Sequence, residues 1–313
     1  MLLLVGALAS LGVGVAEVGL GDLLLFRLTA EQWQVLAISR VPRLLAILLA
    51  GSALSVAGLI MQRITQNRFV SPSTSGTVES AVLGILIATL LFAEAPLLIK
   101  MVIAIITAIA GTAVFLKLLE HIRTSEPIVV ALVGIMFGAV ITAITVFIAF
   151  RRDLLQFLDI WTTGSFSGVL QGRYEPLFAV LVMGAIGYAF ADRFTVVGMG
   201  EAFATNLGVR YRATLNVGLV VVSVTAAVVV VVVGAIPFLG LIIPNVVSLV
   251  LGDNVRTVLP ATALTGAGFV LVCDVVGRLV RHPYEIPAST VAGVVGGIVF
   301  LVLILRTAKG ATP

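Results

Sequence analysis

The chain consists of long hydrophobic stretches separated by short polar segments. Each stretch has about the length that an α-helix needs to cross the hydrocarbon core of a bilayer, roughly 17–25 residues. The strands of a membrane barrel would instead alternate apolar and polar positions over about ten residues. The pattern predicts about ten membrane-spanning helices, near residues 1–20, 41–62, 76–93, 96–116, 127–150, 175–191, 213–234, 237–251, 258–280 and 284–305.

The composition supports a membrane protein. Hydrophobic residues make up 60% of the 313 residues, charged residues only 11%, and the mean hydropathy is +1.21. A soluble domain carries about 25% charged residues. Because a backbone in lipid must satisfy its own hydrogen bonds, we expect an all-α, polytopic fold with one transmembrane domain over residues 1–313.

The net charge of +4 does not indicate nucleic-acid binding, because the Lys and Arg residues are dispersed through the polar segments. The single cysteine, Cys273, excludes an internal disulfide and a Cys-x-x-Cys site. The N-terminal stretch contains "ALAS", which resembles a signal-peptidase site. It has no Lys or Arg before Arg27, so we interpret it as the first span.

One polar insert interrupts this pattern, the segment "GMGEAFATNLGVRYRAT" at residues 198–214. Its spacing predicts a short helix over about 200–207, with Phe203 and Leu207 on one face. Gly208 is suited to end this helix in a left-handed conformation. Such an element either lies along the membrane surface or docks against another protein, and spacing alone leaves both open.

Charged residues also mark the edges of two predicted spans. Arg40 and Arg43 flank Pro42, which fits the first turn of a helix near residue 41. Asp274 precedes Arg278 by four residues, which predicts an ion pair on one helix face. The arginines at residues 40 and 43 are also compatible with simple contact to lipid headgroups.

Six segments, in order, resemble the FecCD family of permeases. They are "RVPRLLAILLAGSALSVAGLIMQ", "NRFVSPSTSG", "GEAFATNLGV", "GAIPFLGLIIPN", "LPATALTGAGFVLVCDVVGR" and "YEIP". Members of this family are membrane subunits of type II ABC importers for iron–siderophore complexes, haem or vitamin B12. The chain looks closest to the siderophore branch, and the resemblance implies a multi-pass protein of the bacterial inner membrane.

The resemblance also implies partners and site residues. Two permease chains, identical or related, would pair above two copies of a cytoplasmic ABC ATPase and receive substrate from an extracytoplasmic binding protein. Arg40, Arg43 and Arg278 match positions that dock the binding protein. The family's coupling helices match residues 198–210. The residues expected to contact the ATPase are Gly200, Glu201, Ala202, Phe203, Ala204, Thr205, Asn206, Leu207 and Gly208.

A path for a bulky chelate would be lined by small, hydroxyl and methionine side chains, and we expect Met136, Thr142 and Thr145 to contribute. Two places depart from the family pattern. Asn245 and Ser248 replace residues that are often basic in relatives, and Glu79 lies in a stretch of usually small residues. A gating role is therefore not transferred to either place.

Other classes of function remain as alternatives. A haem or vitamin B12 permease would share this fold, and a secondary transporter driven by an ion gradient would use intramembrane charges such as Glu79. "GLGD" at residues 19–22 resembles an aspartyl-protease motif, but the partner of Asp22 would have to be Asp274.

No phosphate-binding loop, HExxH or Cys-x-x-Cys motif is present. We therefore expect a transport subunit without enzymatic activity or a bound cofactor, in which a partner ATPase hydrolyses ATP. His121 and His282 lie singly in different polar segments, so we expect no metal site.

Overall fold

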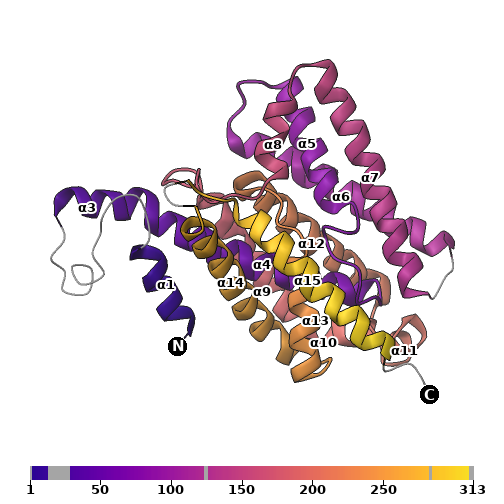
Figure 1. The fold of residues 1–313 in the computed structure, drawn as a ribbon. Coiled ribbons are helices and arrows are strands. Elements are labelled where there is room, and N and C mark those ends of the chain that lie inside the picture. The colour runs from indigo at the N-terminus through magenta and orange to yellow at the C-terminus, as the bar shows by residue number, and fades with distance from the viewer. Residues whose placement is uncertain (1, 13–28, 123–125, 282–283, 310–313) are drawn as a thin grey trace.

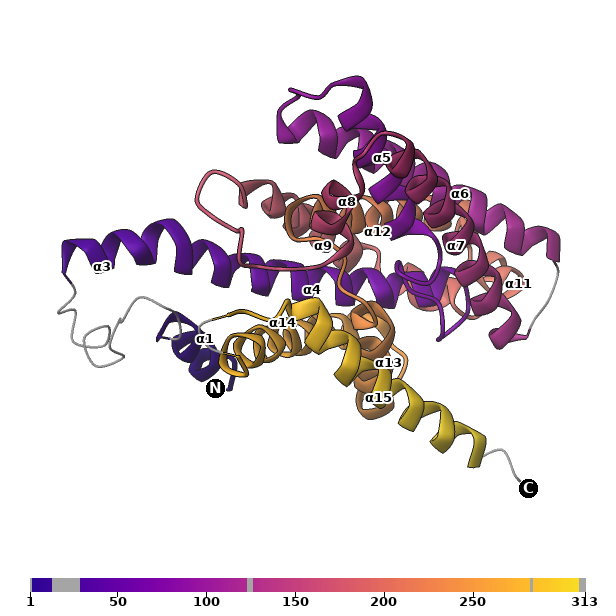
Figure 2. The ribbon, with the colours of Figure 1, turned by 45° about the horizontal axis from the view of Figure 1, so that its top comes forward.

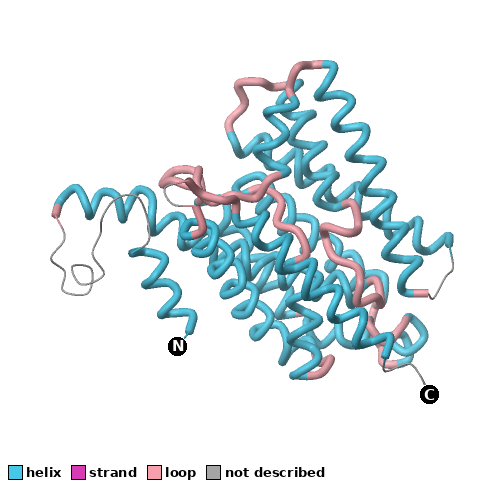
Figure 3. The backbone as a smooth tube through the Cα atoms, in the orientation of Figure 1, coloured by secondary structure: helices cyan, strands magenta, loops and turns pink. Residues whose placement is uncertain are grey.

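The structure is a computed structural model that describes residues 2–12, 29–122, 126–281 and 284–309. Within these ranges every regular element is a helix (Figures 1 and 3). In chain order the elements are α1 (Leu2–Gly12), α3 (Ala30–Val35), η1 (Leu36–Arg40), α4 (Val41–Ile64), α5 (Thr77–Leu91), α6 (Leu97–Ile122), α7 (Pro127–Arg151), α8 (Leu155–Thr162), η2 (Glu175–Phe178), α9 (Ala179–Ala189), α10 (Ala191–Val197), α11 (Glu201–Asn206), α12 (Tyr211–Val233), α13 (Leu239–Leu251), α14 (Val255–Leu279) and α15 (Ala288–Lys309).

The predicted helices are present, and the fold is that of a multi-pass membrane protein. Five continuous helices are long and apolar enough to span a bilayer: Ala30–Ile64, α6, α7, α12 and α14. The pair formed by η2–α9 and α10 also passes this test together, although it bends by 61°. Shorter apolar helices occupy the other predicted spans, namely α1, α5, α13 and α15. The number of complete crossings stays a prediction.

Helix α4 lies at the centre of the larger of two hydrophobic clusters, where α9, α12, α13 and α14 pack around it (Figures 1 and 2). Glycines allow this close packing. A Cβ atom on Gly58 would lie only 1.9 Å from the carbonyl oxygen of Gly240, and one on Gly51 would lie 2.7 Å from that of Gly266. Because apolar burial does not drive helix association in lipid, close backbone approach at small residues stabilises these crossings.

The second cluster joins α5, α6, α7 and α8 and touches the first through α12 (Figure 1). Helix α5 is short because the preceding residues 65–76 form an irregular segment, which is largely buried from Val70 onward. Ser71 and Ser75 in this segment are fully buried. Its backbone is satisfied locally; for example, Ser71 N donates to Thr74 Oγ1 over 2.8 Å. Irregular backbone at this depth is tolerated because protein covers it.

The helix start predicted near Pro42 is that of α4, which begins at Val41 with Pro42 in its first turn, but α4 continues an earlier helical segment without a break. The helix begins at Ala30, where Thr29 and Gln32 form a reciprocal capping box. It then continues through a π-helical turn, Leu36–Arg40, into α4. Proline lacks the N–H that a continuous α-helix would require, and a π turn just before it adjusts the hydrogen-bond ladder. A proline that is typical of a helix start therefore lies within a longer helix.

Helix α4 runs between two ends of the molecule that carry different sites. We call them the Arg43 end, where α4 begins, and the α11 end, where α4 finishes at Ile64. Figure 2 shows α3 and α11 on opposite sides of the bundle, with α4 extending between them. Residues 13–28 lie outside the described residues, and with them the "GLGD" motif and Asp22. His282 also lies outside them.

Candidate functional site

Helix α11 adopts the shape that the sequence predicted for the polar insert. Glycines in positive-φ conformations bound it, with φ of +108° at Gly200 and +75° at Gly208. These conformations strain residues that carry a Cβ, so glycine is favoured at both points. The final turn closes through Val209 N, which donates to Ala204 O over 2.9 Å. The short helix therefore begins and ends at fixed positions between α10 and α12.

Part of the exposed surface around this element is apolar. Met199, Phe203 and Leu207 have exposed fractions of 61%, 48% and 58%. Phe203 and Leu207 are four residues apart, and Met199 lies just before Gly200, after the end of α10. Ala204 is the residue of α11 that is fully buried against the bundle. We call Met199, Phe203 and Leu207 the α11 stripe. The expected coupling residues Glu201, Ala202, Thr205, Asn206 and Gly208 are also exposed, and Gly200 is partly buried.

Helix α10 attaches the stripe to the bundle. Its residues Phe194 and Val197 are fully buried, and it contacts α4, α12 and α14. Thr195 Oγ1 accepts a hydrogen bond from Val255 N at the start of α14, over 3.0 Å. Asp192 forms an exposed ion pair with Arg256, also on α14, at 2.5 Å. A displacement of α11 would therefore reach α14 and α4 through packed contacts.

A charged cluster borders α10 at the same end. Asp253, in the turn between α13 and α14, accepts from Arg63 and Arg68, each over 2.9 Å. The three side chains line a cleft of about 500 Å³ together with Gln62, Gln66, Asn67, Thr195, Gly198, Met199, Asn245, Ser248 and Asn254. Asn245 donates to the carbonyl oxygens of Arg68 and Leu241. The residue that departs from the family pattern thus bridges α13 and the segment after α4.

The pKa of Asp253 is lowered from its ordinary value. Partial burial alone would raise this pKa, but the hydrogen bonds and charges of Arg63 and Arg68 outweigh it. The carboxylate side chain is nevertheless 53% exposed. We therefore expect the cluster to be ionised at neutral pH and accessible to solvent.

The Arg43 end carries a buried network instead. Asp274 binds Arg43 and Arg278, each at 2.7 Å, and its side chain is only 2% exposed. Arg43 also pairs with Glu285 at 2.9 Å, and Arg278 donates to the hydroxyl of Ser10 over 2.6 Å. The predicted Asp274–Arg278 pair is confirmed, but it is part of a larger network that joins α1, α4 and α14.

Arg40 belongs to the same end and is 8% exposed; its guanidinium donates to the carbonyl oxygen of Leu11. The arginines expected to dock a binding protein are therefore bound by groups of this chain. Arg43 lies closest to solvent through Glu285, whose side chain is 31% exposed.

The path residues expected on α7 lie in different environments. Thr142 lines two adjoining cavities, of about 470 and 170 Å³, along the seam between α5 and α7. Thr145 lines the smaller one and donates to Ile141 O over 2.8 Å. Met136 is 62% exposed and does not line either cavity. Glu79 lines both cavities.

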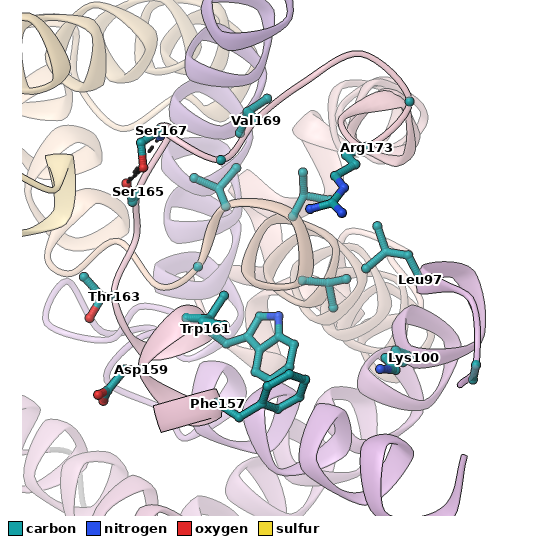
Figure 4. Close-up of a pocket in the computed structure, with 18 residues that line it drawn as sticks. Leu97, Lys100, Phe157, Asp159, Trp161, Thr163, Ser165, Ser167, Val169 and Arg173 are labelled. Atoms are coloured by element: carbon teal, nitrogen blue, oxygen red, sulfur yellow. Dashed lines mark hydrogen bonds between the residues drawn. The ribbon is translucent and has the colours of Figure 1, made fainter. Parts of the chain in front are cut away.

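A further cavity of about 970 Å³ opens beside α8 (Figure 4). Trp161 and Phe157 form an edge-to-face pair at 4.4 Å, and Lys100 Nζ lies 5.7 Å from the Phe157 ring. Ser165 and Ser167, on the connection after α8, lie within hydrogen-bonding distance at 2.9 Å. Sequence analysis did not predict α8 or this cavity, because eight residues between two long spans look like a simple loop.

The partners in both ion clusters were also missed. Glu285 lies 242 residues after Arg43, and Asp253 lies 190 residues after Arg63. The sequence shows these acids in polar segments but does not show which arginine each one faces. The "YEIP" segment, which matched the family pattern, contains Glu285. That match was a signal that this acid has a structural or functional role.

Comparisons with known proteins agree with this arrangement of helices. The sequence profile of the FecCD transport family matches residues 2–306. The chain is 46% identical over 306 residues to the petrobactin import system permease protein YclN of Bacillus subtilis, covering 98% of this chain and 96% of that protein. It is 42% identical to the ferric-anguibactin transport system permease protein FatD of Vibrio anguillarum, covering 89% of each.

A solved structure shows the same fold. A metal-chelate type ABC transporter in an inward-facing conformation superposes with a TM-score of 0.83 at 25% identity, covering 97% of this chain and 96% of that one. The helical bundle and the segment order are thus those of an ABC-importer permease. The chain belongs to the FecCD transport family.

Proposed function

We propose that this chain is a permease subunit of an ATP-driven importer that takes up iron(III)–siderophore complexes. The observation that carries the proposal is the similarity, along nearly the whole chain, to permeases named for petrobactin and ferric-anguibactin. The residues of the site support it, because the chain offers a docking stripe and a helical path but no phosphate-binding loop. ATP would therefore be bound and hydrolysed by a separate subunit.

The α11 end would face the cytoplasm and the Arg43 end the extracytoplasmic side of a bacterial inner membrane. The α11 stripe supports this orientation. Three exposed apolar side chains, two of them four residues apart along α11, form a surface that an ATPase groove can bury. Closure of two ATPases on ATP would displace α11, and α10 would pass this displacement to α4, α12 and α14 through its buried contacts.

A second permease chain would complete the path. The seam between α5 and α7 opens to the surface of this chain, and neighbouring α7 residues such as Val140 and Phe147 are strongly exposed. Pairing two such surfaces would enclose a path between the chains and cover apolar area. The partner is either a second copy or a related permease.

A binding protein would dock at the Arg43 end. Arg43 is bound by Glu285 at the surface, so an acidic residue of the binding protein could exchange with Glu285. Arg40 and Arg278 would act beneath it by holding α1, α4 and α14 in place. In this view the docking role falls mainly on Arg43.

Capture of the ATPase tests the coupling role. Tagged wild-type protein should retain the ATPase in detergent, whereas Leu207→Asp and Glu201→Lys should reduce the retained amount at least about tenfold. A charge buried in an apolar interface is strongly unfavourable. Leu207→Met is the matched control, because it keeps an apolar side chain of similar size and should bind normally. If both charged variants hold the ATPase as well as wild type, the coupling assignment is wrong.

Uptake measurements test the substrate and the energy source. Cells that depend on this permease should import ferric petrobactin or ferric anguibactin in preference to haem and vitamin B12. Depletion of ATP with the proton gradient intact should stop uptake. Continued uptake under those conditions would instead favour a gradient-driven transporter, for which Glu79 would be the first residue to examine.

A further inference from the structure

Glu79 is an intramembrane carboxylate that the coupling and docking sites do not use. It lies in the first turn of α5, and its side chain faces α7 at Gly138, near the middle of that 25-residue helix. A Cβ atom on Gly138 would lie 3.3 Å from Glu79 Cδ, so the glycine leaves room for the carboxyl group. Ionisable residues at this depth are costly and mark functional sites by default.

One oxygen of the Glu79 carboxylate lacks a hydrogen-bond partner among the described residues. Glu79 Oε2 is buried and has no hydrogen-bond partner among the described residues, and Glu79 forms no ion pair with them. Buried polar atoms in native structures are normally paired, so an unpaired one indicates a missing ligand, water or ion. The carboxylate is therefore available to a group that enters from outside the chain.

The surroundings show where such a group would come from. Glu79, Thr142 and Val146 line both cavities of the α5–α7 seam. The larger cavity extends past Ser73 and Gly134, whereas the smaller reaches Leu158 and Thr162 of α8. Glu79 thus lies where the two cavities adjoin along the length of α7. The larger volume, about 470 Å³, is within the range of small-molecule sites.

The chemistry favours an organic cation over a bare metal ion. Among the described residues, Glu79 is the single carboxylate that lines the two cavities, and the other side-chain oxygens there are neutral hydroxyls of Ser73, Thr142, Thr145 and Thr162. A calcium ion prefers several carboxylate and carbonyl oxygens, and no described His or Cys lines either cavity. An ammonium group donates three hydrogen bonds and is well served by a carboxylate and hydroxyls. Ile135 and Val146 supply apolar walls for its alkyl chain.

We propose that Glu79 is a binding residue within the translocation path that attracts an ammonium group on the passing substrate. The inference rests on the proposed function in that it takes the α5–α7 seam to be the path. It adds a property of the substrate class, namely a positively charged arm that the iron-binding groups leave free. It also explains why an acid is tolerated where relatives usually have small residues.

The test compares how fast positively and negatively charged thiol reagents modify a cysteine placed at residue 142. It therefore does not depend on knowing the siderophore. Thr142→Cys is prepared with Cys273→Ala, in the full importer with its partner subunits in membrane vesicles. A cationic trimethylammonium-ethyl and an anionic sulfonato-ethyl methanethiosulfonate are applied with and without ATP. With Glu79 present, the cationic reagent should react faster. Glu79→Gln should lower the cation-to-anion rate ratio about tenfold, as expected for removing one nearby charge in water.

Ser167→Cys, on the exposed connection after α8 and outside both seam cavities, is the matched control, and Glu79→Gln should leave its ratio unchanged. Glu79→Asp should preserve the selectivity at residue 142. Should Glu79→Gln fail to assemble, the ratio at residue 142 compared with that at residue 167 carries the test. An unchanged ratio, or an introduced thiol at residue 142 that reacts with neither reagent in either state, would overturn the proposal. If the importer with Glu79 shows the charge selectivity at residue 142 but does not take up a ferric siderophore, the result counts against the proposed function alone.

Discussion

Near each end of α4, one aspartate lies between two arginines, but the two aspartates differ in their exposure to solvent. At one end Asp274 lies between Arg43 and Arg278 with 2% of its side chain exposed. At the other end Asp253 lies between Arg63 and Arg68 with 53% exposed. Twenty residues separate Arg43 from Arg63, about 30 Å along a helix. The first triad is centred on a buried carboxylate and the second on an exposed one, although the side chains of Arg43 and Arg63 are similarly buried, at 14% and 17% exposed.

This difference assigns different mechanical roles to the two ends. Removing one partner of a buried ion pair leaves an uncompensated charge in a low dielectric, so the Asp274 triad should hold α1, α4 and α14 together throughout the cycle. An exposed ion pair contributes little free energy and exchanges readily with water. In the proposed mechanism the Asp253 triad would therefore open and close as α10 and α11 move. The Arg43 end is expected to be rigid and the α11 end adjustable because their aspartates differ in burial, although the residue types are the same.

The largest effect is expected at the buried triad. Asp274→Asn should lower the free energy of unfolding by about 3–5 kcal/mol, because Arg43 and Arg278 lose the charge between them. Thermal unfolding in detergent measures this as a large drop in Tm. Asp192→Asn, which removes an exposed pair with Arg256, is the control and should have little effect. Equal Tm values for the two variants would contradict the distinction between the ends.

A smaller effect is expected for Arg43→Lys. The Arg43 guanidinium binds Asp274 and Glu285 at once, and a lysine ammonium lacks the planar fork needed for both. Losing one hydrogen bond between charged groups should cost about 1.5–3 kcal/mol. Arg63→Lys at the other end of α4 should cost less, and the comparison of the two Tm shifts checks this order. The reverse order would mean that exposure does not decide the strength of these contacts.

The sequence predicted the local features and missed the distant ones. The α11 helix, its left-handed Gly208 and the Asp274–Arg278 pair depend on residues at most eight positions apart, and the structure confirms them. The contacts of Arg43 with Asp274 and Glu285 join residues more than 200 positions apart. Only the packing of α4 against α14 brings them together. Hydrophobic periodicity shows that helices exist but not which polar ends meet.

Two further features have a similar origin. Pro42 lies in the first turn of α4, where its missing N–H is harmless, but a π turn joins α4 without a break to the helix that begins at Ala30. Helix α8 was not predicted, since its eight residues are too few to span a membrane. In both cases the surrounding fold decided between local conformations that the sequence permits.

At the exposed triad, Asp253→Asn should change the free energy of unfolding by no more than about 1 kcal/mol. Its effect should appear in function instead, as a changed ratio of ATP hydrolysed to substrate imported, because the cluster borders α10. Parallel assays of ATP hydrolysis and uptake in vesicles measure this ratio. A large loss of stability with an unchanged ratio would show that this end is as rigid as the other.

The smallest effect is the pH dependence of that contribution. The folded-state pKa of Asp253 lies below its ordinary value of 3.8. Its stabilising contribution is therefore present above the unfolded pKa and is lost as the pH falls through the folded pKa. The Tm difference between wild type and Asp253→Asn should be constant near neutral pH and vanish only below about pH 4. A difference that disappears at a higher pH would contradict this assignment.

Dependence on a separate ATPase tests the central claim most directly. The permease, with its partner permease chain where one is required, is reconstituted into vesicles with the binding protein and ferric petrobactin, with or without the cytoplasmic ATPase. Uptake should require both ATPase and ATP, and Leu207→Asp should abolish it while Leu207→Met leaves it intact. Uptake at the full rate by vesicles that contain no ATPase would contradict the account.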